Sequence, residues 1–244
     1  LIFGLPPLVL CGVLLLKYGI GNWVLITAYL YWQWFHYTRQ SYGISQFYKR
    51  RATGLVVENE RLSQLTFYLL PLWGILYRSY QGPDTFISLE LKTMPVPGIA
   101  VYIIGAAAVV TLGWWIVTRA RMYWNGNLPL AHTLYMLSHF TVFYVGYVLI
   151  DSIDFGWLVL NIWHNAQYIA FVWIYNSNRF KSGIDPKAKF LSTISQKRNV
   201  WLYFLICLGA SLIVYLAIDT VATALPALVV IYAGINFHHY IVDG

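Results

Sequence analysis

The sequence predicts an all-α fold, namely a polytopic helical membrane protein with about eight transmembrane helices. Its 244 residues are 59% hydrophobic and only 10% charged, whereas about a quarter of the residues in soluble domains are charged. Uncharged apolar stretches of roughly 18 to 22 residues recur along the chain, and a helix of that length crosses about 30 Å of hydrocarbon. Because lipid offers no hydrogen bonds, we expect the backbone polar groups to be satisfied within helices.

Turn-forming residues separate the first four predicted spans. The glycines at 19 and 21, followed by an asparagine, join spans 3–18 and 22–37 as a tight hairpin. A polar and basic segment then leads to span 62–78, which ends before the turn sequence QGPD at 81–84. Prolines at 95 and 97 precede span 98–118, as expected because proline is tolerated at the start of a helix but not in its interior.

The last four spans are bounded in the same way. The sequence NGN at 125–127 precedes span 128–150, and a segment with two aspartates, 151–154, separates this span from span 156–175. The basic segment 179–198 precedes the final hairpin of spans 200–218 and 221–243. We therefore expect one transmembrane domain over residues 1–244. Because the sequence begins with Leu1 and not with methionine, we also expect residues to precede it.

The basic residues are distributed unevenly between the two predicted sides of the membrane. Thirteen of the 16 Lys and Arg residues lie in the loops after the second, fourth and sixth spans. Because Lys and Arg favour cytoplasmic loops, both ends of this sequence are predicted to face the cytoplasm. Topology then accounts for the net charge of +7, so nucleic acid is not an expected partner. The expected partners are the lipid bilayer, a lipophilic substrate and other membrane subunits.

All six histidines fall in the cytoplasmic half of the predicted spans. Ionisable groups inside a membrane are costly and usually mark a functional site. Most of these histidines have a polar neighbour one helical turn away, as metal ligands need for their orientation. The predicted metal ligands are His36, His139, His164, His238 and His239, and the predicted supporting residues are Gln40, Gln167, Asp243, Tyr135 and His132.

Structural interpretations of the same histidines stay open at this stage. His132 lies near a helix end, where a hydrogen-bonded packing role is common. His238 and His239 are about 100° apart on a helix, so one of them can face lipid headgroups while the other faces a site. Imidazole and carboxylate groups suit iron, copper or zinc, and no thiolate is expected nearby to hold an iron–sulfur cluster. The expected cofactor is non-haem iron, with haem or another metal as the alternative.

The layout resembles the histidine-box integral membrane enzymes of the desaturase and hydroxylase families. The residues that carry the resemblance are His36, His139, His164, His238 and His239, with Gln40 and Asp243. The resemblance implies helices that place a histidine-rich iron site at the cytoplasmic face. The sequence lacks the HxxxH and HxxHH boxes of those families. Its histidine count is closer to that of the membrane carotene-cleaving oxygenases, although their PHGAxD-like signature is not found.

The predicted function is that of an iron-dependent membrane oxidoreductase acting on a lipophilic substrate. A metal that activates dioxygen needs a dry, shaped cavity with an open coordination position. One alternative is a cofactor-binding or accessory subunit of a larger membrane complex, with histidines as ligands of haem or chlorophyll. Another is a membrane acyltransferase with His239 as general base and Asp243 orienting it. A transporter is disfavoured because no internal repeat is evident.

Overall fold

In the residues that the structure describes, the regular secondary structure is helical apart from one very short hairpin. This computed structural model describes residues 4–52, 59–222 and 228–243; the side chains of 214–222, 228–229 and 243 lie outside the description. The hairpin pairs β1 (Thr85–Phe86) with β2 (Leu89–Glu90) in antiparallel register. The prediction of an all-α fold is confirmed. The helices form two compact units, Leu1–Leu160 with Ala233–Gly244, and Asn161–Tyr232, and the single domain expected over 1–244 stays a prediction.

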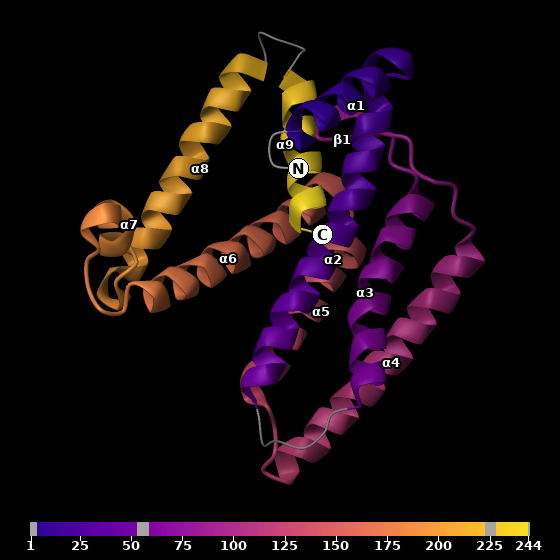
Figure 1. Ribbon diagram of the computed structural model, residues 1–244. Coiled ribbons are helices and arrows are strands. Elements are labelled where there is room, and N and C mark those ends of the chain that lie inside the picture. Colours follow the sequence, from indigo (N-terminus) through magenta and orange to yellow (C-terminus); the bar gives the residue numbers. More distant parts are fainter. Residues whose placement is uncertain (1–3, 53–58, 223–227, 244) are drawn as a thin grey trace. The chain divides into compact units, whose positions relative to one another are not determined.

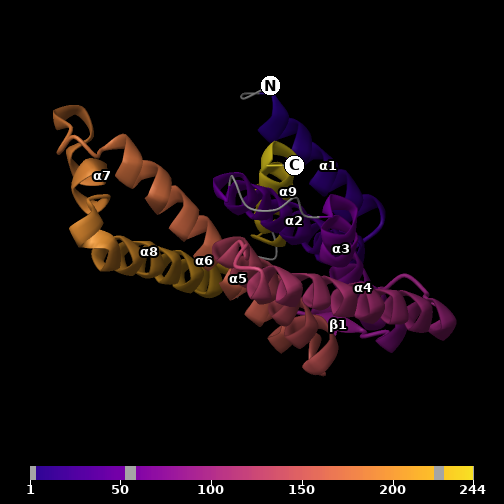
Figure 2. The ribbon, with the colours of Figure 1, turned by 90° about the horizontal axis from the view of Figure 1, so that it is seen from below.

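The first unit is built around α2, α3, α4 and α5, which pack against one another (Figures 1 and 2). Helix α3 packs against α4 and α5, and α2 packs against α3, α5 and the short α1. A π-helical turn, η1, continues α5 before α6 begins. The bounds are α1 Leu5–Gly19, α2 Asn22–Arg51, α3 Glu60–Gln81, α4 Gly98–Trp124, α5 Leu130–Tyr144, η1 Val145–Leu149, α6 Ile153–Arg179 and α9 Leu228–Asp243.

The second unit holds the rest of α6, the first residues of α9 and the segments between them. These segments are two 3-10 turns, η2 (Pro186–Ala188) and η3 (Lys197–Asn199), and the helices α7 (Lys189–Ile194) and α8 (Val200–Ala222). The hydroxyl of Ser192 donates to the carbonyl oxygen of Ala188 at 2.8 Å and accepts from the backbone N–H of Asp185 at 3.0 Å. Ser192 therefore fixes the start of α7 against the preceding turn.

Among the described residues, one helix is both long enough and apolar enough to cross a membrane. This helix is α4, and only 22% of its most apolar window is buried. Helix α1 is apolar but shorter. Of the eight predicted spans, only 98–118 thus lies on a helix that meets both criteria, and part of span 221–243 lies outside the described residues. The predicted span 128–150 is interrupted because α5 ends at Tyr144 and gives way to the π-helical turn.

Helix α2 is much longer than the predicted span 22–37. Its polar side chains recur at intervals of four residues, which places them on one helical face. This face is buried: Tyr29, Gln33, Tyr37, Ser41 and Ser45 are each less than 5% exposed. The prediction ended the span where polar residues become frequent, but the helix continues to Arg51 because these residues are packed inside the first unit.

Helices α5 and α6 approach closely at two glycines. A Cβ atom at Gly156, in the first turn of α6, would overlap the carbonyl oxygen of Gly146 in the π-helical turn. A Cβ atom at Gly146 would in turn lie 2.8 Å from the carbonyl oxygen of Gly156. Both neighbours are backbone atoms, which cannot rotate away as a side chain does. The absence of side chains at these two positions is therefore required by the packing.

Gly156→Ala is expected to destabilise the protein by about 1–3 kcal/mol, because overpacking at a backbone contact forces the two helices apart. The matched control is Gly113→Ala in α4, where an added Cβ meets no atom within 4 Å. This control should be neutral or stabilising by about 0.5–1 kcal/mol, because alanine restricts the unfolded chain. Thermal unfolding in detergent, followed by circular dichroism, measures both. Equal stability of the two variants would contradict the packing argument.

Candidate metal centre

Two of the predicted ligands, His36 of α2 and His239 of α9, face each other within the first unit. Their ring centroids are 4.9 Å apart, and His36 is only 3% exposed. Aromatic contacts hold the end of α9 on α2 at this level. Phe237 stacks on Trp32 with centroids 5.4 Å apart, and the ring of Tyr240 lies 4.7 Å from that of His36.

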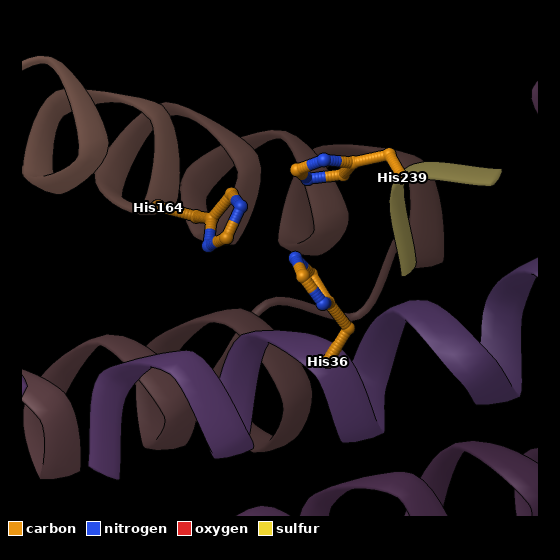
Figure 3. A group of neighbouring side chains, drawn as sticks. All are labelled: His36, His164 and His239. Carbon is orange, nitrogen blue, oxygen red and sulfur yellow. The ribbon is translucent and has the colours of Figure 1, made fainter. Parts of the chain in front are cut away.

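His164 supplies a third imidazole beside this pair. It lies on α6. His164 is 6% exposed. One ring nitrogen from each of His36, His164 and His239 lies within 4.8 Å of the others. Figure 3 shows the three rings pointing toward one another; these three residues are called the histidine triad below.

The donor set of the histidine triad fits a first-row transition metal. Three neutral imidazoles suit zinc, copper, iron or nickel and leave positions open for water or substrate. Nitrogens bound to one tetrahedral ion at about 2.1 Å lie about 3.4 Å apart. The three nitrogens of the histidine triad, which lie within 4.8 Å of one another, need only a small inward movement to share an ion.

The amide oxygen of Gln40 gives the same region a second polar feature. Gln40 follows His36 by one helical turn, and its Oε1 atom is buried without a hydrogen-bond partner in the described part of the chain. A buried acceptor of this kind calls for an explanation such as a bound water molecule or ion. The orienting role predicted for Gln40 from the sequence stays a prediction.

Two of the five predicted ligands are not part of the histidine triad. His238 precedes His239 on α9, and neighbours on a helix point about 100° apart. His139 lies on α5 and is completely buried at another place in the first unit. Its ring stacks on Phe67 with centroids 3.7 Å apart.

Both ring nitrogens of His139 have protein partners. The Nε2–H donates to the carbonyl oxygen of Phe67 at 3.1 Å, because a carbonyl can only accept. The neutral ring therefore has a lone pair at Nδ1, which accepts from the Ser41 hydroxyl at 3.0 Å. The hydroxyl of Tyr135 lies 2.9 Å from the same Ser41 oxygen. His139 thus joins α2, α3 and α5 by hydrogen bonds, and Tyr135 supports it there, away from the histidine triad.

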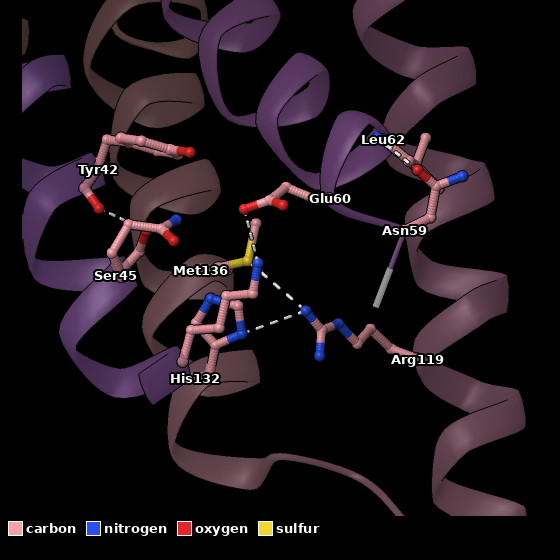
Figure 4. Close-up of polar contacts among 10 residues, drawn as sticks. Tyr42, Ser45, Asn59, Glu60, Leu62, Arg119, His132 and Met136 are labelled. Atoms are coloured by element: carbon pink, nitrogen blue, oxygen red, sulfur yellow. Dashed lines mark hydrogen bonds and ion pairs between the residues drawn. The ribbon is translucent and has the colours of Figure 1, made fainter. Parts of the chain in front are cut away.

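His132 takes part in a separate buried cluster near the start of α5. The Arg119 guanidinium donates to Nδ1 of His132 at 3.3 Å, since arginine has no acceptor, and it also contacts the sulfur of Met136 at 3.8 Å (Figure 4). The same guanidinium lies over the ring of Trp115, 4.9 Å from its centroid. His132 is therefore a packed, hydrogen-bonded residue in this structure, which agrees with the structural interpretation left open above.

The remaining predicted supporting residues are placed as follows. Gln167 lies on α6 one turn after His164 and is half-buried. Asp243 is the last residue of α9, and its side chain lies outside the described residues. The orienting roles predicted for these two residues stay predictions.

A polar network beside the histidine triad was missed by the sequence analysis. The Gln33 amide nitrogen donates to the hydroxyls of Tyr29 at 2.9 Å and Tyr37 at 2.6 Å. The indole N–H of Trp157, on α6, donates to the Gln33 amide oxygen at 2.6 Å. The network joins α2 to α6 at Trp157, about two helical turns before His164. Its signal in the sequence is the four-residue spacing of Tyr29, Gln33 and Tyr37, which places the three side chains on one helical face.

Comparison with known proteins finds no matching family model, no matching curated protein and no matching solved structure. The functional argument therefore depends on the residues themselves.

Proposed function

We propose that this chain is a metal-dependent membrane oxidoreductase that holds an iron ion at the histidine triad and acts on a lipophilic substrate. The observation that carries the proposal is the meeting of three imidazoles, from α2, α6 and α9, within 4.8 Å. Two of these rings are more than nine-tenths buried. Histidine is the commonest metal ligand in proteins, and several imidazoles around one point are what a shared transition-metal ion needs.

The proposed roles follow from the donor atoms. His36, His164 and His239 would hold the ion, and Gln40 would orient a ring or a bound water through its buried amide oxygen. A bound iron ion supplies the capacity to activate dioxygen. The rings of Trp32, Phe237 and Tyr240 pack on one another, with Tyr240 against His36, and would give this side of the triad an apolar environment.

The proposal includes the membrane location. Helix α4 supports it by length, composition and its exposed apolar face, which includes Ile103, Val110 and Trp114, each at least 60% exposed. In the described part of α8, Trp201 and Leu205 are also apolar and more than 60% exposed. On this proposal the chain crosses the bilayer about eight times with both ends facing the cytoplasm, as the basic residues indicate.

The protein purified in detergent is expected to contain about one iron ion per chain and to lack a Soret band. Elemental analysis of the pure protein, combined with its visible spectrum, measures both. A strong Soret or chlorophyll band would instead favour the cofactor-binding subunit. A preparation without any transition metal that also fails to bind added Fe²⁺, Zn²⁺ or Co²⁺ would end the metal proposal and leave the acyltransferase to be tested.

A further inference from the structure

An apolar groove runs between α3 and α4, on helices that contribute no residue to the histidine triad. Its volume is about 530 Å³, and aromatic rings from α3, including Trp73, Tyr77 and Tyr80, form one wall. The other wall is α4, with Tyr102, Ala106 and Val109. Pockets of roughly 300–1,000 Å³ lined by apolar and aromatic residues are typical of ligand sites.

Two glycines of α4 give the groove its shape. A Cβ atom at Gly105 would lie 2.7 Å from the indole nitrogen of Trp73, so only glycine lets this ring lie against the α4 backbone. Two turns earlier, the Tyr80 ring lies against Gly98 in the same way, at 3.2 Å from an added Cβ. The tyrosine end of the groove is therefore at the start of α4, and the indole end lies deeper along the helix.

The length and chemistry of the groove match one acyl chain. From Gly98 to Val110 the groove follows α4 for 12 residues, or about 18 Å at a helical rise. One leaflet of a bilayer provides about 15 Å of hydrocarbon. Tyr77, Tyr80 and Tyr102 line the end of the groove near the start of α4. Tyrosine is enriched at membrane interfaces, where the polar end of a lipid lies.

We infer that this groove binds a single acyl chain of a lipid, with its polar end at the tyrosines and its methyl end near Val109. The inference rests on the proposed membrane location, but not on the metal. A packed helix from a partner is a poorer occupant because helix–helix interfaces in membranes favour small residues, whereas the α3 wall is made of large aromatic rings, two of which already lie against the glycines of α4.

The test uses palmitic acid that carries a photoreactive diazirine on its chain, added to the protein in detergent and mapped by peptide mass spectrometry. Labelling is expected to saturate and to concentrate on the peptides of α3 and α4. Ala106→Trp, which fills the groove from an exposed position, should lower this labelling about tenfold. The matched control is Ile103→Trp, because Ile103 is 60% exposed on the same helix but does not line the groove.

Each outcome decides the inference. Labelling spread evenly over the apolar helices, or unchanged in Ala106→Trp, would overturn it. Cross-linking of α4 to α4 of a second copy, at the expense of the fatty acid, would assign the groove to self-association instead. Flotation of the protein with lipid vesicles tests the membrane location separately. If the protein is labelled selectively but does not float, the groove binds an acyl chain and the proposed membrane location is wrong.

Discussion

Alanine at any one of the three triad positions, in His36→Ala, His164→Ala and His239→Ala, is expected to leave the purified protein without a retained metal ion. Each substitution removes one of three imidazoles whose nitrogens lie within 4.8 Å of one another. Loss of a residue that merely orients a ligand weakens metal binding about 10- to 100-fold, so loss of a ligand should weaken it further. Metal content after dialysis, measured by elemental analysis, checks this expectation.

Two other histidines provide matched controls. His238→Ala changes the neighbour of His239 on the same helix and should retain the metal. His139→Ala should also retain the metal. This substitution removes a completely buried ring with partners on α2 and α3, so it is expected to lower the melting temperature. Gln40→Ala should give an intermediate loss of affinity, because it leaves the three imidazoles in place.

These variants also distinguish the ligand set grouped in the structure, the histidine triad, from the larger ligand set predicted from the sequence, which includes His139 and His238. If folded His139→Ala lost the metal while His36→Ala kept it, the ligand set would have to be rebuilt around α5. If all the variants kept the metal, the histidine triad would be a packing cluster. Circular dichroism of each variant establishes that metal loss does not reflect unfolding.

The sequence predicted the helical fold because long apolar stretches leave few alternatives to a helix. It placed the boundaries of α2 poorly because burial was assumed to require apolar residues. In the structure, the hydroxyls and amides of Gln33, Ser41 and Ser45 are buried on one face. Partners such as Trp157 and His139, which are more than 90 residues away in sequence, satisfy two of them. Such long-range pairs are not visible in the spacing of a single helix.

The candidate site could be predicted only in part for the same reason. Depth in a predicted span is readable from the sequence, and the three histidines that group in the structure, His36, His164 and His239, were all assigned to the cytoplasmic half of their spans. The rotation of each helix about its axis is not readable. That rotation turns His139 toward Phe67 and Ser41, and it turns His239 rather than His238 toward His36.

Arg78 shows a further limit of sequence-based prediction, because in the sequence it is only the basic residue that ends the predicted span 62–78. It is 1% exposed. Its guanidinium donates to the carbonyl oxygens of Gly146 at 3.0 Å and Asp151 at 2.7 Å, and also to that of Ile150. These carbonyls belong to the π-helical turn and the residues after it, where the ordinary helical hydrogen bonds end. A cation at the C-terminal end of a helix also interacts favourably with the helix dipole.

Arg78→Met is therefore expected to destabilise the protein by about 3 kcal/mol or more. Methionine fills a similar volume but donates no hydrogen bond, so one buried and two partly buried carbonyls lose a charged donor, and a buried loss of this kind costs about 1–3 kcal/mol. Arg78→Lys should recover only part of this loss, because an ammonium group lacks the planar fork that reaches several carbonyls at once. The midpoint of unfolding in detergent, measured by circular dichroism, gives the comparison.

The control for charge alone is Arg121→Met, because Arg121 is an exposed arginine in the last turn of α4. Its removal should change stability by less than about 0.5 kcal/mol, as is usual at exposed positions. If Arg78→Met were as stable as Arg121→Met, the carbonyls after the π-helical turn would have to be satisfied by water, and Arg78 would not hold α3 to this turn. If Arg78→Lys were fully stable, charge at the end of α5 would matter more than the fork of hydrogen bonds.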